Sequence, residues 1–339
     1  MNAGMKAPMK APMKAWVVQI PGQELVMVER PVPTPGANDI VIRVLTCGVC
    51  RTDLHVRDNE LADLSFPVIP GHQVVGEVVA AGKHAVIPVG KRVGVAWLGW
   101  TCGTCAYCKH GQENLCDNAR FHGCHIDGGY AEFMRADARY CFVLDRQLNP
   151  ATTAPLLCAG LIGFRSLRLA GHAERIGIYG FGSAAHIVTQ IARHDGQQVY
   201  AFTRPGDESA QRFARELGAE WAGGSDEPAP CELDAALIFA PVGALVPKAL
   251  RDIRKGGSVV CGGIHMSNIP EFPYVDLWGE RLIRSVANLT RQDGRDFMAL
   301  AADGFLTPQV TTYALDDANR ALADLQEGRI NGSAVLVVE

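Results

Sequence analysis

The sequence predicts an α/β protein in which a β-rich domain is joined to a domain built on a doubly wound parallel sheet. Three observations predict this class. Short apolar or alternating runs, separated by Gly and Pro, dominate residues 14–150. Strand-like and helix-like patterns alternate over residues 151–290, which is typical of a parallel sheet. A strand, a glycine-rich turn and a helix follow one another at residues 175–196.

The β-rich part takes its expected strands from these short runs, at residues 15–20, 24–30, 39–50, 72–82 and 91–100. Residues 1–13 repeat the unit MKAP and predict a mobile tail that is not a secretory signal. Beyond Arg291 we expect helices at 295–304 and 315–328 and a terminal strand at 333–339 that rejoins the first domain. The predicted domains are therefore 14–150 with 291–339, and 151–290.

The second domain is expected to open with a single helix over residues 151–171. A strand at 176–179, a glycine turn and a helix follow, and then a strand at 197–204 and a helix at 209–218 with apolar residues at helical spacing. Further buried strands are predicted at 236–241, 258–264 and 282–288. With 339 residues, the chain can bury a separate core in each domain.

Four cysteines lie close together in the pattern C-x2-C-x2-C-x7-C: Cys102, Cys105, Cys108 and Cys116. Three thiolates at this spacing can bend round one ion, and the fourth closes a tetrahedron after a longer loop. Such an all-sulfur set leaves no position open for a substrate, so the pattern predicts a structural zinc site. Disulfides, unconnected buried thiols and an iron–sulfur cluster are the alternatives.

The turn after the strand at 176–179 has the pattern G-x-G-x-x-A, with Gly180, Gly182 and Ala185. This is a form of the dinucleotide fingerprint, in which the first glycine allows a tight turn and the second lets a pyrophosphate approach the backbone. The helix that follows offers free N–H groups and a positive dipole to the phosphates. The position between strand and helix favours this function over simple packing of glycines.

The next strand ends with Thr203 and Arg204, at the place where an acidic residue grips the ribose of NAD. A hydroxyl and a guanidinium suit a 2′-phosphate instead, so we expect NADP(H) to be preferred over NAD(H). Asp207 and Glu208 follow closely and remain within possible reach of the ribose. The alternative for Arg204 is a solvated loop charge.

Three further stretches carry residues of metal-ligand type: GVCRTDLH (48–55), PGHQVVGEV (70–78) and LLCAG (156–160). Together with the four cysteines and the glycine turn, they resemble the zinc-dependent alcohol dehydrogenases of the medium-chain dehydrogenase/reductase superfamily. The resemblance runs from residue 14 onward in the family's order. It implies a GroES-like catalytic domain, a Rossmann domain, and hydride transfer between an alcohol and the C4 atom of nicotinamide, which gives an aldehyde or ketone.

By this resemblance Cys50, His72 and Cys158 are the ligands of a catalytic zinc. Two thiolates and an imidazole leave a fourth position for water or alcohol. Asp53 matches the carboxylate that orients the ligating histidine. Gln73 departs from the family, which has glutamate there, and the lost charge is expected to make zinc more electrophilic and to slow ligand exchange.

The remaining roles also come from the resemblance. Thr52 and His55 match a proton relay, and Arg51 and Arg291 match arginines that bind the cofactor pyrophosphate. Trp97 matches an aromatic position that lines the substrate channel of shorter microbial members; Trp100 and Leu289 are weaker candidates. The chain length is similar to that of those members, which implies a homo-oligomer, a tetramer or a dimer, that acts on a small aliphatic or aromatic alcohol.

The composition excludes several classes of partner. The net charge of -4 offers no basic surface for nucleic acid or an anionic membrane, and no apolar run reaches the ~20 residues of a membrane-spanning helix. The cysteines outside the two metal sites are interpreted as reduced thiols in or near the core, which favours the cytoplasm; they are Cys47, Cys124, Cys141, Cys231 and Cys261.

Three other functions remain as alternatives. Polyol or cinnamyl-type dehydrogenases share the zinc and the fold. A zinc-free quinone reductase shares the fold, but Cys50, His72 and Cys158 argue against it. A non-enzymatic zinc protein that senses redox state or nucleotide belongs to a different class, and Gln73 is the residue that favours it.

Overall fold

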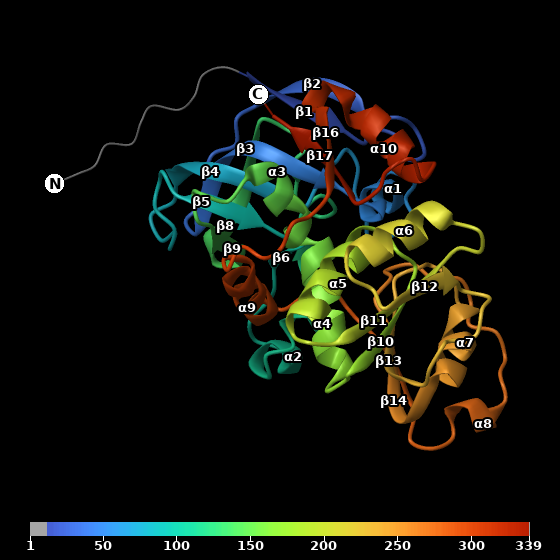
Figure 1. The fold of residues 1–339 in the computed structure, drawn as a ribbon. Helices are drawn as coiled ribbons and strands as arrows, with labels where there is room; N and C mark the ends of the chain where they lie inside the picture. Colours follow the sequence, from blue (N-terminus) through green and yellow to red (C-terminus); the bar gives the residue numbers. More distant parts are fainter. Residues whose placement is uncertain (1–11, 339) are drawn as a thin grey trace. The chain divides into compact units, whose positions relative to one another are not determined.

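The computed structural model describes residues 12–338, which form two compact units (Figure 1). Unit 1 contains the described part of residues 1–158, 290–302 and 308–339, and unit 2 contains residues 159–289 and 303–307. The border between them lies after Cys158, whereas the expected border followed Pro150. Cys158 therefore belongs to the same unit as Cys50 and His72.

The described chain begins inside a strand. Residues 1–11 of the predicted tail lie outside the described residues, but Pro12 and Met13 belong to β1 (Pro12–Val17), which pairs with β2 (Val26–Pro31). The tail prediction is therefore wrong for these two residues. The reason is the alternating pattern of β1, in which Met13, Ala15 and Val17 are buried.

Unit 1 is built around a seven-stranded sheet with the order β16-β17-β3-β4-β5-β9, to which β8 adds by pairing with β3. The strands are β3 (Asp39–Val49), β4 (Val74–Ala81), β5 (Arg92–Val95), β8 (Phe133–Asp137), β9 (Cys141–Val143), β16 (Val310–Ala314) and β17 (Ser333–Val337). β3 is long enough to pair with β8 over its first half and with β17 over its second half. β17 thus completes a sheet whose first strand in the sequence is β3.

Shorter elements surround this sheet. They are α1 (Arg51–Arg57), β6 (Leu98–Trp100), α2 (Ala106–Lys109), β7 (Arg120–Phe121), α3 (Pro150–Thr153), α9 (Arg291–Ala301) and α10 (Ala318–Gln326). Inward-facing Val, Ile and Ala residues of the sheet form one continuous core with Leu54, Tyr130 and Leu322. This core holds the end of β3, after which α1 begins, and the start of β4, into which the preceding loop leads.

Unit 2 is a doubly wound sheet with six parallel strands in the order β12-β11-β10-β13-β14-β15. The strands are β10 (Arg175–Tyr179), β11 (Gln198–Thr203), β12 (Trp221–Gly224), β13 (Leu233–Ile238), β14 (Ile253–Cys261) and β15 (Leu282–Ser285). The strand order reverses beside β10, where β11 lies on one side and β13 on the other. In open sheets of this kind, ligands bind at the carboxyl ends of the strands at the point of reversal.

The helices of unit 2 are α4 (Ala159–Ala170), α5 (Ser183–His194), α6 (Glu208–Glu216), α7 (Leu245–Asp252) and α8 (Tyr274–Leu277). Figure 1 shows α4 and α5 side by side on one face of the sheet and α7 on the other face. Both faces are therefore covered, which is why β10 and β13 read as continuous apolar runs in the sequence. Among the described residues, no helix is both long enough and apolar enough to span a membrane.

Candidate active site

Cys50, His72 and Cys158 come together in unit 1, although they lie far apart in the sequence. One possible ligand atom from each residue lies within 4.8 Å of those of the other two. The Sγ atom of Cys50 is 3.2 Å from Nε2 of His72. Cys50 follows β3, His72 precedes β4 and Cys158 precedes α4. Two sulfurs and one imidazole nitrogen in this arrangement suit a zinc ion with one position left open.

Cys50 is held at the start of α1 by its own capping interactions. Its Sγ accepts a hydrogen bond from the backbone N–H of Thr52, and its backbone N–H donates to Oδ2 of Asp53 at 2.9 Å. This reciprocal arrangement is a capping box with a thiol in place of the usual hydroxyl. The sequence CRTD therefore fixes both the helix start and the direction of the thiol.

Cys158 interrupts the segment that was predicted as one helix over 151–171. The structure has α3, a 3₁₀ turn at Ala154–Leu157 and then α4, and Cys158 between them has non-helical angles (φ -137°, ψ -69°). The prediction of an unbroken helix is wrong because Pro155 lacks the N–H group that a continuous helix needs there. The break separates Cys158 from the regular helix and lets its thiol reach Cys50 and His72.

The charges of this cluster favour a bound cation. Burial lowers the pKa of His72, but the negative charges of Cys50 and Asp53 outweigh it and raise that pKa to about 10. The pKa of the Cys50 thiol is lowered by the hydrogen bond between Cys50 and Cys158 and by the positive charge of His72. The same sulfur–sulfur contact, together with burial, raises the pKa of the Cys158 thiol. A cluster that binds a proton this strongly can bind a metal cation in its place.

Asp53 is buried beside His72. Its Oδ1 accepts the backbone N–H of Gly71 at 3.1 Å and lies 3.3 Å from Nδ1 of His72. The contact with Nδ1 has the distance of an ion pair but not the alignment of a hydrogen bond. Burial raises the pKa of Asp53, and the charge of His72 opposes this shift. The hydroxyl of Tyr130 also donates to Asp53, a contact that sequence reasoning missed.

Thr52 and His55 both lie on α1, three residues apart and therefore on one face of the helix. Thr52 is buried at its second position. Nδ1 of His55 lies 2.5 Å from Oε2 of Glu60, a partner that the sequence analysis did not identify. Arg51, the first residue of α1, is exposed.

Trp97 lies against the imidazole of His72. The two rings meet edge to face with their centroids 4.9 Å apart, and Trp97 stacks on Phe121 at 5.1 Å. Trp97 therefore forms a wall beside the ligand cluster. Trp100, at the end of β6, is exposed, and Leu289 is buried within unit 2.

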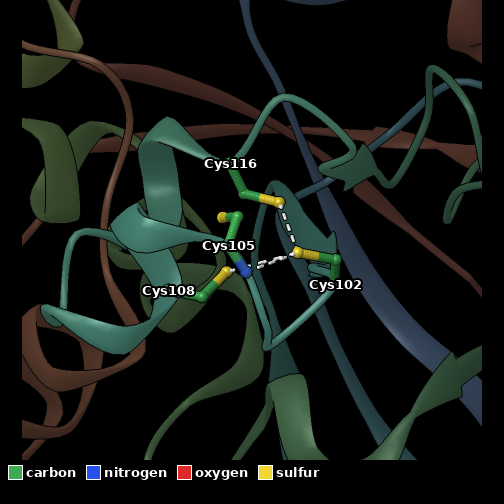
Figure 2. Close-up of side chains that lie close together, drawn as sticks. All are labelled: Cys102, Cys105, Cys108 and Cys116. Carbon is green, nitrogen blue, oxygen red and sulfur yellow. Dashed lines mark hydrogen bonds between the residues drawn. The ribbon is translucent and has the colours of Figure 1, made fainter.

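The four cysteines of the second predicted site form a compact lobe around α2 (Figure 2). Sγ of Cys102 lies 3.6 Å from Sγ of Cys116 and 4.0 Å from Sγ of Cys108. Zinc–sulfur bonds of ~2.3 Å in a tetrahedron separate the sulfurs by roughly 3.8 Å, so the observed spacing fits zinc. All eleven cysteines lie in the described part of the chain and none is paired in a disulfide, which removes that alternative.

Cys102 is prepared to carry a negative charge. The backbone N–H groups of Thr104 and Cys105 donate to its sulfur at 3.5 and 3.4 Å. These hydrogen bonds lower the pKa of Cys102 to about 6. The thiolate, which is the form that binds metal, is thus favoured at neutral pH.

Arg291 is paired with an acidic side chain of its own unit. Its Nε donates to both carboxylate oxygens of Glu113, at 2.9 and 3.0 Å, and its guanidinium lies over the ring of Tyr140. Glu113 is a buried carboxylate of the four-cysteine lobe, and Arg291 supplies the positive partner that it requires. The expected role of Arg291 in pyrophosphate binding stays a prediction.

The glycine turn of unit 2 has the shape that its sequence predicts. Gly180 has φ +88°, and a Cβ atom there would come within 2.7 Å of Ala240. Gly182 caps the start of α5, and a Cβ atom there would meet no atom within 4 Å. Ala185 is buried against the sheet. The start of α5 thus leaves open space beside Gly182, as anion binding at a helix start requires.

Thr203 and Arg204 have different surroundings. The hydroxyl of Thr203 is buried and bonds to the carbonyls of Arg204 and Gly223, at 3.0 and 3.2 Å, so it serves the fold. The predicted contribution of this hydroxyl to cofactor binding is corrected for that reason. Arg204 is exposed. Asp207 caps α6 through Oδ1, which accepts the N–H of Ala210.

One unit holds a set of metal-ligand residues, two thiols and an imidazole, and the other holds a dinucleotide-type turn. This combination defines the class of metal-dependent dehydrogenases. Residues 36–146 match the family model described as "Alcohol dehydrogenase GroES-like domain". The chain is 43% identical over 337 residues to a probable alcohol dehydrogenase of Mycobacterium tuberculosis, covering 96% of this chain and 97% of the relative. The chain belongs to the zinc-type alcohol dehydrogenases of the medium-chain dehydrogenase/reductase superfamily.

Solved structures show the same fold. A putative zinc-binding dehydrogenase from Sinorhizobium meliloti, bound to NADP, is 25% identical with a TM-score of 0.87 and covers 97% of this chain and 100% of its own. An acetophenone reductase from Geotrichum candidum in complex with NAD is 25% identical with a TM-score of 0.86, covering 98% of both chains. The chain is thus an oxidoreductase, and the alternative of a non-enzymatic sensor is not favoured.

Proposed function

We propose that this alcohol dehydrogenase interconverts small alcohols with aldehydes or ketones, prefers NADP(H), and holds two zinc ions per chain. The observation that carries the proposal is the convergence of Cys50, His72 and Cys158 on one point. These three residues hold the catalytic zinc, and Cys102, Cys105, Cys108 and Cys116 hold a structural zinc. When bound at the three-residue site, zinc supplies Lewis acidity at its open position.

The protein's own residues carry out the remaining tasks. Asp53 holds the imidazole of His72 through charge and keeps Cys50 at the helix start. The hydroxyl of Thr52 takes the proton of the substrate alcohol, and His55 passes it toward solvent. The carboxylate of Glu60 lies against Nδ1 of His55 and fixes the orientation of the imidazole. This assignment makes Glu60 a positioning residue of the relay.

The cofactor pyrophosphate is assigned to Gly180, Gly182 and the first turn of α5. Arg204 binds the 2′-phosphate of NADP, since it is exposed beside the end of β11. The backbone of Thr203 shapes this end, while its hydroxyl is used internally. Similar proteins have been solved with NADP and with NAD, so both cofactors are compatible with the fold.

The substrate pocket of unit 1 is assigned to Trp97. Trp97 stands edge-on to His72 and offers an apolar wall beside the metal ligands. This wall suits a small aliphatic or aromatic alcohol. Polyols, which need several polar partners, fit an indole wall less well.

The oligomer is proposed to form through the edge strand β15. Leu282 of this strand is exposed, and Tyr274, Val275 and Trp278 just before it are exposed as well. An exposed apolar edge strand is a site of pairing with another chain, and an identical copy pairs with it antiparallel. The eleven unpaired cysteines support a reducing compartment, the cytoplasm.

An initial-rate comparison of NADPH and NADH with a panel of aliphatic and aromatic aldehydes tests the function. We expect faster turnover with NADPH and two zinc ions per chain by metal analysis. Equal or better rates with NADH would contradict the assignment of Arg204. A metal content of one zinc per chain would contradict the catalytic metal site.

A further inference from the structure

The loop that carries His72 is clamped by a glycine-rich segment from elsewhere in unit 1. Backbone N–H groups of this segment donate to carbonyl groups of the loop before His72, in the pairs Gly128–Ile69 (2.7 Å), Gly129–Gly71 (3.0 Å) and Tyr130–Pro70 (3.0 Å). Three hydrogen bonds from consecutive residues thus fasten the loop to this segment. The position of Tyr130 relative to the metal cluster is fixed by its backbone as well as by its side chain.

The ring of Tyr130 fills the space above Gly71. Gly71 has φ +98°, and a Cβ atom there would come within 2.4 Å of the Tyr130 ring and 2.7 Å of Sγ of Cys47. Tyr130 itself is fully buried. The close fit leaves the ring no alternative position, so its hydroxyl is directed at one place.

That place is the carboxylate of Asp53. The hydroxyl of Tyr130 donates to Oδ2 at 3.2 Å, and the N–H of Cys50 donates to the same oxygen at 2.9 Å. The other oxygen, Oδ1, accepts from Gly71 and faces Nδ1 of His72. Three donors therefore hold the buried carboxylate so that Oδ1 stays turned toward the imidazole.

We propose that Tyr130 is a positioning residue of the catalytic metal site, which sets the orientation of Asp53 and, through it, of His72. The inference rests on the proposed function, because it takes Cys50, His72 and Cys158 as the metal ligands. A buried carboxylate that loses a donor turns toward its remaining donors. Oδ1 of Asp53 then no longer faces Nδ1 of His72, and the ring loses part of the contact that holds it in the ligating orientation.

The variant Tyr130→Phe tests this role, since it keeps the ring and removes the hydroxyl. In the zinc-loaded enzyme we expect the affinity of the three-residue site for zinc, measured by competition with a chelator, to fall about 10-fold or more, as is typical when an outer-shell partner is lost. The four-cysteine site of the same molecule is the internal reference and should keep its zinc. Cobalt(II) placed in the three-residue site should also show shifted absorption bands.

Tyr313→Phe is the matched control. Tyr313 is also buried in unit 1, and its hydroxyl donates to an aspartate, Asp324, at 2.7 Å, away from the ligand cluster. This variant should keep wild-type zinc affinity and the wild-type cobalt spectrum. If Tyr130→Phe behaves like Tyr313→Phe in both measurements, the proposal is overturned.

A second variant keeps the test decisive if Tyr130→Phe does not fold. Asp53→Asn leaves Tyr130 intact and breaks the same series of contacts at its centre. It should lower the zinc affinity of the three-residue site by a comparable factor, and an unchanged affinity would overturn the proposal. The two hypotheses fail in different ways. A wild-type chain that binds two zinc ions but oxidises no alcohol with either cofactor contradicts the function, while the effect of Tyr130 on zinc affinity is measured independently of turnover.

Discussion

Glu113 and Arg291 form a two-pronged ion pair across a separation of 178 residues. The pair joins the four-cysteine lobe to the start of α9, the helix with which the chain returns to unit 1. The backbone N–H of Arg291 also donates to Glu113, at 2.8 Å. A carboxylate thus anchors both the side chain and the first turn of α9, where the helix dipole favours negative charge.

Replacing Glu113 with alanine should lower the free energy of unfolding by about 2–4 kcal/mol, because Arg291 is left half-buried without its partner. Urea unfolding of the zinc-loaded protein checks this value. Arg193→Ala is the control: its pair with Glu220 is exposed on both sides, and such pairs contribute about 0–1 kcal/mol. Equal effects of the two variants would contradict the anchoring role.

Asp234 should make stability depend on acidity. Burial raises its pKa, but hydrogen bonds from Arg254 and from the N–H groups of Glu174 and Arg175 outweigh this and lower it below the usual 3.8. The folded protein then binds fewer protons than the unfolded chain, so the stabilisation is complete above pH 3.8 and is lost as pH falls through the lower folded pKa.

The comparison of wild type with Asp234→Asn by urea unfolding at pH 7, 5 and 3 measures this term. The difference in unfolding free energy between the two proteins should be the same at pH 7 and pH 5 and smaller at pH 3. A difference that grows on acidification would show that the shift has the opposite sign.

Cys158→Ser should abolish turnover and leave the fold intact. The serine hydroxyl fits the non-helical position but does not replace the thiolate as a zinc ligand. Metal analysis should find one zinc per chain instead of two, and circular dichroism should be unchanged. Cys141→Ser, which changes a buried thiol outside both clusters, should keep both zinc ions and full turnover. A Cys158→Ser enzyme with wild-type turnover would show that the ligand set is wrong.

Gly71 and Gly90 form a natural pair for separating backbone strain from steric overlap. Both have positive φ, +98° and +87°, but a Cβ atom meets the Tyr130 ring at Gly71 and nothing within 4 Å at Gly90. Gly90→Ala should cost about 1–2 kcal/mol from its backbone alone. Gly71→Ala should cost at least about 2 kcal/mol more, because the ring cannot move aside. Thermal unfolding gives both values, and equal shifts in Tm would contradict the tight fit.

Arg204→Ser should raise the KM for NADPH by about 10–100-fold and leave the KM for NADH within about twofold. A charged hydrogen bond to a phosphate contributes about 1.5–3 kcal/mol, and NADH has no such phosphate. Arg212→Ser, on the exposed side of α6, is the control and should change neither constant. Parallel changes with both cofactors would mean that Arg204 does not select between them.

The sequence was sufficient to predict those parts of this enzyme whose structure depends on residues close together in the chain. The spacing of Cys102 to Cys116 and the glycine turn at Gly180 are both short-range signals. Each constrains its own backbone, which is why they could be recognised without a structure.

What the sequence did not reveal depends on distant contacts. Nothing in the residues around Arg291 indicates that Glu113 will neutralise it, and nothing around Tyr130 indicates Asp53. The break at Cys158 had a local signal in Pro155, but the apolar pattern of the segment outweighed it in the prediction of a single helix. Long-range partners such as these are chosen by the packed fold.

The pairing of β17 with β3 sets an order of events during synthesis. Ala334 pairs with Val49, the residue directly before Cys50, so the ribosome must have synthesised β17 before the strand leading into that cysteine gains its neighbour. The nucleotide-type unit is complete in the nascent polypeptide well before this happens. Completion of the strand that leads into the thiol–imidazole centre therefore waits for β17, and a substitution that weakens this strand pairing would act on Cys50 directly.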